Sequence, residues 1–114
     1  MPAASRDTLK EIRQRIAAIH QALVEMEYLC SGSLRTRTKL CGNPRCRCRK
    51  DRAARHGPYY DWGFVQDGRV RHRALSPGRA ELIRVAIGNY KKVKELLKEW
   101  EAETVRMIEL KVPE

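Results

Sequence analysis

The chain has 114 residues, 42% of them hydrophobic, and a formal net charge of +10 at pH 7. This length suits one small domain with a modest core, and we expect a single domain over residues 1–114. No stretch approaches the ~20 apolar residues of a membrane span, and the N-terminus lacks the basic-then-apolar order of a signal peptide. We therefore expect a cytoplasmic protein, in a compartment where thiols stay reduced.

The positive charge is concentrated in the middle of the chain. Residues 31–76 contain twelve Lys or Arg against three Asp, a net of +9, whereas residues 1–30 are neutral and residues 77–114 carry +1. A field of this density attracts polyanions, and nucleic acid is the commonest such partner of a cytosolic protein. The alternative interpretation is a solvated surface that promotes solubility.

Residues 7–30 have the pattern of an amphipathic helix. Thr8 followed by Glu11 forms a capping-box start, and the run 31–33 (Ser-Gly-Ser) is a credible stop. The apolar positions alternate three and four residues apart, as in a heptad seam: Leu9, Ile12, Ile16, Ile19, Leu23, Met26 and Cys30. Because Cys30 continues this seam, we interpret it as a packing residue rather than a metal ligand.

The basic segment 31–58 contains a cluster of potential metal ligands. Three thiols fall within eight residues and an imidazole follows, in the order Cys41, Cys46, Cys48 and His56. Three sulfurs and one ring nitrogen complete a tetrahedral set for Zn²⁺, and the cations between them would offset the thiolate charge. We expect a zinc loop here. Two alternatives stay open: the cysteines are small buried hydrophobes, or His72 replaces His56.

Residues 59–75 carry the signal of a β-hairpin. Two β-prone runs flank Gln66-Asp67-Gly68-Arg69, and Asp-Gly is a preferred pair for a two-residue type I′ turn. This register places one row of side chains on a single face: Tyr60, Trp62, Phe64, Arg71 and Arg73. The row could stack on bases, or it could be the core face of the hairpin.

A second helix is expected over residues 77–110. Ser76 is a good N-cap, and Pro77 is a good first helical residue. The apolar seam again alternates three and four residues apart: Ile83, Ala86, Tyr90, Val93, Leu97, Trp100, Thr104 and Met107.

The expected fold is therefore mainly α with a small β-hairpin. It consists of two long heptad-patterned helices packed antiparallel and linked by the Cys-rich zinc loop and the hairpin, with seam residues such as Leu97 buried. The first helix would span about 35 Å and the second about 50 Å. The surplus apolar stripe near Trp100 and Ile108 predicts a homo-oligomer, most simply a dimer with coiled-coil character.

We do not expect an enzyme. A catalytic zinc keeps an open position for water and usually has a carboxylate nearby as general base. The middle segment offers only Asp51, Asp61 and Asp67, and it has no glycine-rich phosphate loop. A nucleic-acid surface is the better-supported prediction, and its candidate residues are Arg35, Arg37, Lys39, Arg45, Arg47, Arg49, Lys50, Arg52, Arg55, Arg71 and Arg73.

The cluster also carries a resemblance. Cys41-Gly-x-Pro-x-Cys46-x-Cys48, then His56-Gly-Pro-Tyr-Tyr, a hairpin and a helix containing Asn89-Tyr90 resembles a family of small bacterial proteins of unknown function, often met near transposase and other mobile-element genes. The resemblance implies that the three thiols and the imidazole act as one unit. It also implies a mobile-element or DNA-associated role, which favours DNA over RNA, but it supplies no established activity.

Two functions follow as expectations. The first is a zinc-stabilised basic nucleic-acid-binding protein. The alternative is a coiled-coil adaptor whose zinc loop and basic segment contact a partner protein such as a recombinase. Salt-dependent binding to plain DNA or RNA would distinguish them.

Overall fold

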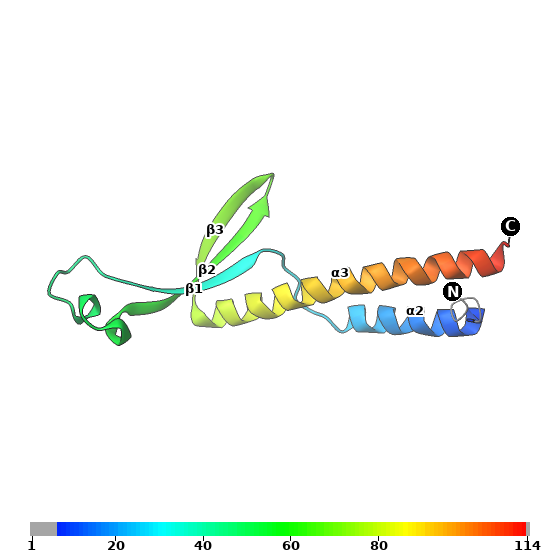
Figure 1. Cartoon of the computed structure of the whole chain (residues 1–114), viewed down its shortest axis with the longest axis horizontal. Helices are drawn as coiled ribbons and strands as arrows, with labels where there is room; N and C mark the ends of the chain where they lie inside the picture. Colours follow the sequence, from blue (N-terminus) through cyan, green and yellow to red (C-terminus); the bar gives the residue numbers. More distant parts are fainter. Residues whose placement is uncertain (1–6, 114) are drawn as a thin grey trace. The chain divides into compact units, whose positions relative to one another are not determined.

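The computed structural model describes residues 7–113 as two α-helices, three strands and two short 3₁₀ helices (Figure 1). In chain order these are α2 (Leu9–Val24), β1 (Ser33–Lys39), η1 (Arg47–Arg49), η2 (Arg52–Ala54), β2 (His56–Gln66), β3 (Arg69–Leu75) and α3 (Pro77–Lys111). The described residues form two compact units: residues 7–29 with 89–113, and Cys30–Gly88. Within residues 7–113, no helix combines the length and apolar character needed to cross a bilayer.

Helix α2 starts at the expected capping box. The backbone N–H of Glu11 donates to the Thr8 hydroxyl at 3.1 Å, and the Thr8 N–H donates to the Glu11 carboxylate at 2.9 Å. The helix buries Ile12 and Ile19, which lie two turns apart on one face.

The apolar seam predicts a helix that continues to Cys30. The helix in fact ends at Val24. The chain beyond it makes tertiary hydrogen bonds instead of helical ones: the side-chain amide of Asn89 donates to the Tyr28 carbonyl at 2.8 Å. A repeat of apolar residues indicates which face is buried, but it does not decide where competing hydrogen bonds end a helix.

Helix α3 begins as predicted, with the N–H of Arg79 donating to the Ser76 hydroxyl at 3.3 Å. Its buried side, however, differs from the predicted seam at Leu97. Leu96 is half-buried and Glu103 is buried, whereas Leu97 is 44% exposed. In this part of α3 the contacts with α2 are made by Trp100 and Glu103, since the His20 ring meets the Trp100 ring and Arg15 donates to the Glu103 carboxylate. The expectation that Leu97 is core is therefore wrong.

Polar and aromatic contacts join α2 to the second half of α3, beside the buried Ile12 and Ile19. The Arg15 Nε donates to the Glu103 carboxylate at 2.8 Å, and the His20 and Trp100 rings meet edge to face with centroids 4.5 Å apart. With α2 only 16 residues long against 35 for α3, the expected pair of long helices packed antiparallel along their length is not shown.

The sheet is larger than the predicted hairpin, which corrects the expected fold class. It has three antiparallel strands in the order β1-β2-β3. The β2–β3 register agrees with the sequence, since Val65 pairs with Val70 and Phe64 with Arg71. The turn between them has positive φ at both Asp67 (53°) and Gly68 (75°), which a type I′ turn requires.

Strand β1 is the element that the sequence did not predict. It reads Ser-Leu-Arg-Thr-Arg-Thr-Lys, and of its side chains only Leu34 is even half-buried. A strand without an apolar face has no period-two signal, so its pairing depends on backbone hydrogen bonds to β2. It starts after Gly32 (φ 110°), next to which the Trp62 indole N–H donates to the Ser31 carbonyl at 3.0 Å.

Candidate metal centre

The pairing of β1 with β2 closes the Cys-rich loop. Lys39, the last residue of β1, pairs with His56, the first residue of β2, beyond a register shift that follows Arg37. Cys41 lies two residues after Lys39. The ladder therefore brings a thiol and an imidazole together from the two ends of the loop, although they are far apart in sequence.

Local turns bring the other two thiols back toward this point. The Asn43 side chain accepts the backbone N–H of Arg45 at 2.9 Å, and its carbonyl accepts that of Cys46 at 3.1 Å. Cys48 lies at the centre of η1 and is 1% exposed. The Asp51 carboxylate then caps η2 by accepting the N–H of Ala53 at 3.0 Å. Short turns of this kind suit a loop that must fold around a small centre.

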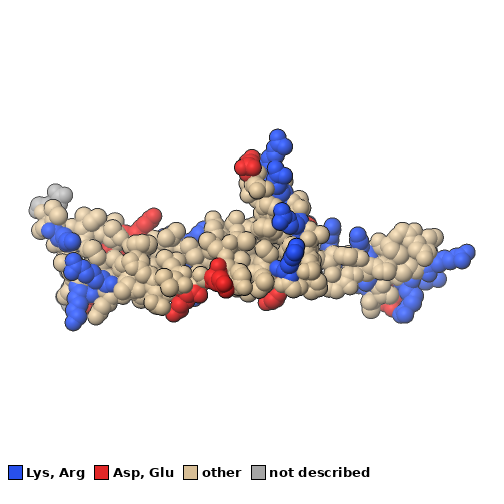
Figure 2. Space-filling view, turned by 180° about the vertical axis from the view of Figure 1, so that it is seen from behind, with Lys and Arg blue, Asp and Glu red and all other residues tan. Residues whose placement is uncertain are grey.

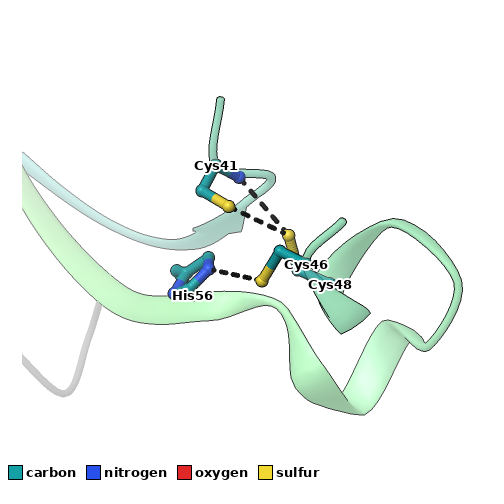
Figure 3. Close-up of side chains that lie close together, drawn as sticks. All are labelled: Cys41, Cys46, Cys48 and His56. Atoms are coloured by element: carbon teal, nitrogen blue, oxygen red, sulfur yellow. Dashed lines mark hydrogen bonds between the residues drawn. The ribbon is translucent and has the colours of Figure 1, made fainter. Parts of the chain in front are cut away.

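The four side chains point toward one another (Figure 3). The Sγ atoms of Cys41 and Cys48 are 3.6 Å apart, and the Sγ of Cys46 lies 3.3 Å from the Nε2 of His56. One ligand atom from each of the four residues lies within 4.8 Å of all the others. The four residues could therefore hold a metal ion.

The spacing of the ligand atoms fits a tetrahedral ion. Sulfurs bound to one Zn²⁺ at about 2.3 Å would be separated by about 3.8 Å, and a sulfur and a nitrogen by about 3.5 Å. The closest observed separations, 3.6 Å and 3.3 Å, are near these values. Three soft thiolates and one imidazole are also a donor set typical of zinc.

The thiols of the cluster differ in acidity. The pKa of Cys46 is lowered to about 6, first by a hydrogen bond from the backbone N–H of Cys48 and then by the His56 ring. For Cys48, the backbone N–H of Cys41 lowers the pKa, but burial and the neighbouring thiols outweigh it, and the pKa is raised overall. Cys46 is thus ready to act as a thiolate ligand near neutral pH, whereas binding at Cys48 would release a proton.

The structure distinguishes between the two candidate histidines. His56 belongs to the cluster, while the Nδ1 of His72 lies 3.3 Å from the Asp61 carboxylate on the neighbouring strand. Cys30 is likewise separate from the four clustered side chains, and it is half-buried.

The structure divides the predicted nucleic-acid residues into three groups. Arg35, Arg37 and Lys39 lie on β1; Arg45, Arg47, Arg49, Lys50, Arg52 and Arg55 lie in the loop; Arg71 and Arg73 lie on β3. Arg35 is opposite Asp61, whereas Arg73 is opposite Trp62. Consecutive β2 residues point to opposite faces of a sheet, so the β1 and β3 arginines do not share a face.

Most of the loop cations face solvent without a carboxylate partner. Of the nine Lys and Arg between residues 35 and 55, all of them described, only Arg47 forms an ion pair, with Asp51 at 3.4 Å. All nine are exposed except Arg55, which is half-buried and whose Nε has no hydrogen-bond partner among the described residues. Lys and Arg outnumber Asp and Glu over the Cys-rich loop in Figure 2.

Three further residues shape the site, and sequence reasoning missed one of them, Asp51. Asn43 and Asp51 hold the turns, and both had a usable signal: an Asn before Pro, and an Asp at the N-cap of a short helix. Gly57 has φ 124°, and a Cβ there would lie 3.0 Å from the Arg37 carbonyl, so only glycine allows this close approach beside His56.

The fold and the site define a small basic α+β protein with a Cys₃His cluster at the end of a three-stranded sheet. Residues 7–84 match the family model described as Domain of unknown function (DUF6788), and the chain belongs to this family. The match includes α2, the sheet, the cluster and the start of α3. None of the curated proteins and none of the solved structures matches the chain.

Proposed function

We propose that this chain is a zinc-stabilised nucleic-acid-binding protein that acts on DNA in preference to RNA. Cys41, Cys46, Cys48 and His56 would hold one Zn²⁺, and the loop around them would contact phosphates. The observation that carries the proposal is the exposed, almost unpaired set of cations on a loop whose only compact feature is the four-ligand cluster.

The metal would act structurally. Four protein ligands complete a tetrahedral zinc site and leave no position for a reacting water, which supports a non-catalytic role. The loop has a single fully buried side chain, Cys48. A bound ion would therefore supply the cohesion that this segment lacks in apolar packing, and it would help to hold the cations close to one another.

The cations best placed for phosphate contact are those of the loop itself. Arg45, Arg49, Lys50 and Arg52 are exposed and belong to one short segment around the cluster. Contacts of this kind position a protein on nucleic acid but do not read sequence, so we expect affinity with little base preference. A role beside mobile-element enzymes in DNA transactions is consistent with this mode of binding.

The test is a titration of the zinc-loaded protein against a fluorescent DNA duplex at several salt concentrations. If about four cations contact phosphates, log K should fall with log salt with a slope near −4. Replacing Arg45 and Arg49 together by Gln should flatten that slope by about two units, because each phosphate contact contributes about 0.9. The matched control is the double Gln variant of Lys10 and Arg13, two exposed cations of α2.

An unchanged slope in the loop variant would contradict the assignment of the phosphate-binding site. A complete lack of salt-sensitive affinity for duplex DNA, single-stranded DNA and RNA would contradict nucleic-acid binding altogether. The basic loop would then serve a protein partner, as in the adaptor alternative, and a recombinase would be the first partner to test.

A further inference from the structure

The second half of α3 carries an apolar stripe that its own unit leaves uncovered. Leu97 is 44% exposed, Val105 54% and Ile108 56%. Their spacing places all three on one side of the helix, next to but distinct from the side that buries Glu103. Two shallow grooves meet along this stripe, and Leu97 and Glu101 line both of them.

Charged residues lie along the same side of the helix as the stripe. The groove around Leu97 is lined by lysines at positions 91, 94 and 98 together with Glu95 and Glu101. Glu101 follows Leu97. It lies seven residues, or about two helical turns, after Lys94, so Lys94 and Glu101 share one side of the helix. On this side of α3 a lysine, Lys94, thus precedes Leu97 and a glutamate, Glu101, follows it.

We propose that this stripe binds the same stripe of a second copy of the chain, with the two α3 helices antiparallel. The two-fold axis would pass between Leu97 and Lys98. Lys94 of each copy then lies beside Glu101 of the other, and Tyr90 lies beside Val105. Because a two-fold interface repeats every contact, one complementary pair in the sequence produces two ion pairs in the dimer.

The order of the charges selects the orientation. A parallel, in-register pair would place Lys94 against Lys94 and Glu101 against Glu101, and like charges at an interface are unfavourable. Burial of Leu97, Val105 and Ile108 would supply the affinity. Ion pairs between helix side chains are individually weak, so the role of these two is to favour the antiparallel partner over the parallel one.

The experiment exchanges the two charges and follows association by sedimentation equilibrium over a concentration series. We expect the wild-type chain to dimerise. Lys94→Glu alone and Glu101→Lys alone should each raise the dimer dissociation constant about tenfold, because each converts two attractive pairs into two repulsive ones. The double exchange should restore wild-type affinity. A mixture of the two single variants should form the heterodimer in preference to either homodimer.

Lys10→Glu is the matched control, since it makes the same change of charge at an exposed position of α2 and should leave association unchanged. Far-UV circular dichroism of each variant verifies that α3 is still helical. A chain that stays monomeric at the highest soluble concentration would overturn the proposal. So would single variants that associate like the wild type, or a double exchange that fails to restore binding.

Discussion

Lys39 and His56 face each other across the β1–β2 ladder. This pairing closes the charged connection into a loop with members of the Cys₃His cluster near both ends, because Cys41 lies two residues after Lys39. Chelation by residues 41–56 therefore requires β1, a strand with no buried face of its own. The sheet and the cluster should stabilise each other, since ordering one reduces the entropy lost on ordering the other.

Replacing Cys46 by Ser should abolish zinc binding, whereas Cys30→Ser should retain one zinc ion per chain. Cys46 belongs to the four-residue cluster and Cys30 does not. Metal content of the purified proteins measures the difference. Hydrogen exchange should show lost protection over residues 40–58 in Cys46→Ser, because a bound ion would supply most of that loop's cohesion. Equal zinc content in the two variants would contradict the assignment.

Replacing Gly32 by Ala should destabilise the sheet by about 1–3 kcal/mol. A Cβ at Gly32 would lie 2.3 Å from the Gly63 carbonyl oxygen, on a backbone with φ 110°. Gly88→Ala is the control, because a Cβ there meets nothing within 4 Å and α3 should gain up to about 1 kcal/mol in helix propensity. Urea unfolding measures both free energies. An unchanged stability in Gly32→Ala would contradict the close approach of Gly32 to the Gly63 carbonyl at the start of the β1–β2 pairing.

Replacing Ile12 by Ala should lower the free energy of unfolding by about 2–5 kcal/mol, because its side chain is completely buried. Val24→Ala on the same helix should change it by less than about 0.5 kcal/mol, since that side chain is 77% exposed. Denaturant titrations at one protein concentration compare the two. Similar costs at both positions would show that α2 is not anchored by Ile12.

Glu103 should make stability sensitive to acid. The hydrogen bond from Arg15 holds the pKa of this carboxyl below its usual value, and Arg106 contributes at 3.1 Å. A lowered folded pKa stabilises the fold above the unfolded value of about 4.3, and the benefit is lost as the pH falls through the folded value. Glu103→Gln should therefore cost about 1 kcal/mol at pH 7, and the cost should shrink below about pH 4.

Thermal unfolding of both proteins between pH 7 and pH 3 gives the comparison. Glu109→Gln is the control, because Glu109 is exposed on the same helix and should show no such convergence. A difference between Glu103→Gln and the wild type that stays constant down to pH 3 would contradict a titrating contribution from this carboxyl.

Short-range chemistry in the sequence determined the starts of the helices, the turn and the members of the Cys₃His cluster. The Thr8–Glu11 capping box, the Ser76 cap and the Asp67-Gly68 turn each depend on residues within a few positions of one another, and all three are present. The members of the cluster could also be predicted from the sequence, because three thiols and an imidazole within sixteen positions can meet in one loop.

Tertiary structure alone decided where α2 ends, that β1 joins the sheet, and which side of α3 is buried. The Tyr28 carbonyl is taken by Asn89, a partner far along the chain, and β1 is ordered by backbone pairing that leaves no pattern in its side chains. Leu97 shows the same limit: the heptad pattern marks it as core, but α2 contacts Trp100 and Glu103 instead and Leu97 is exposed. Such outcomes depend on contacts between distant residues, which local periodicity does not encode.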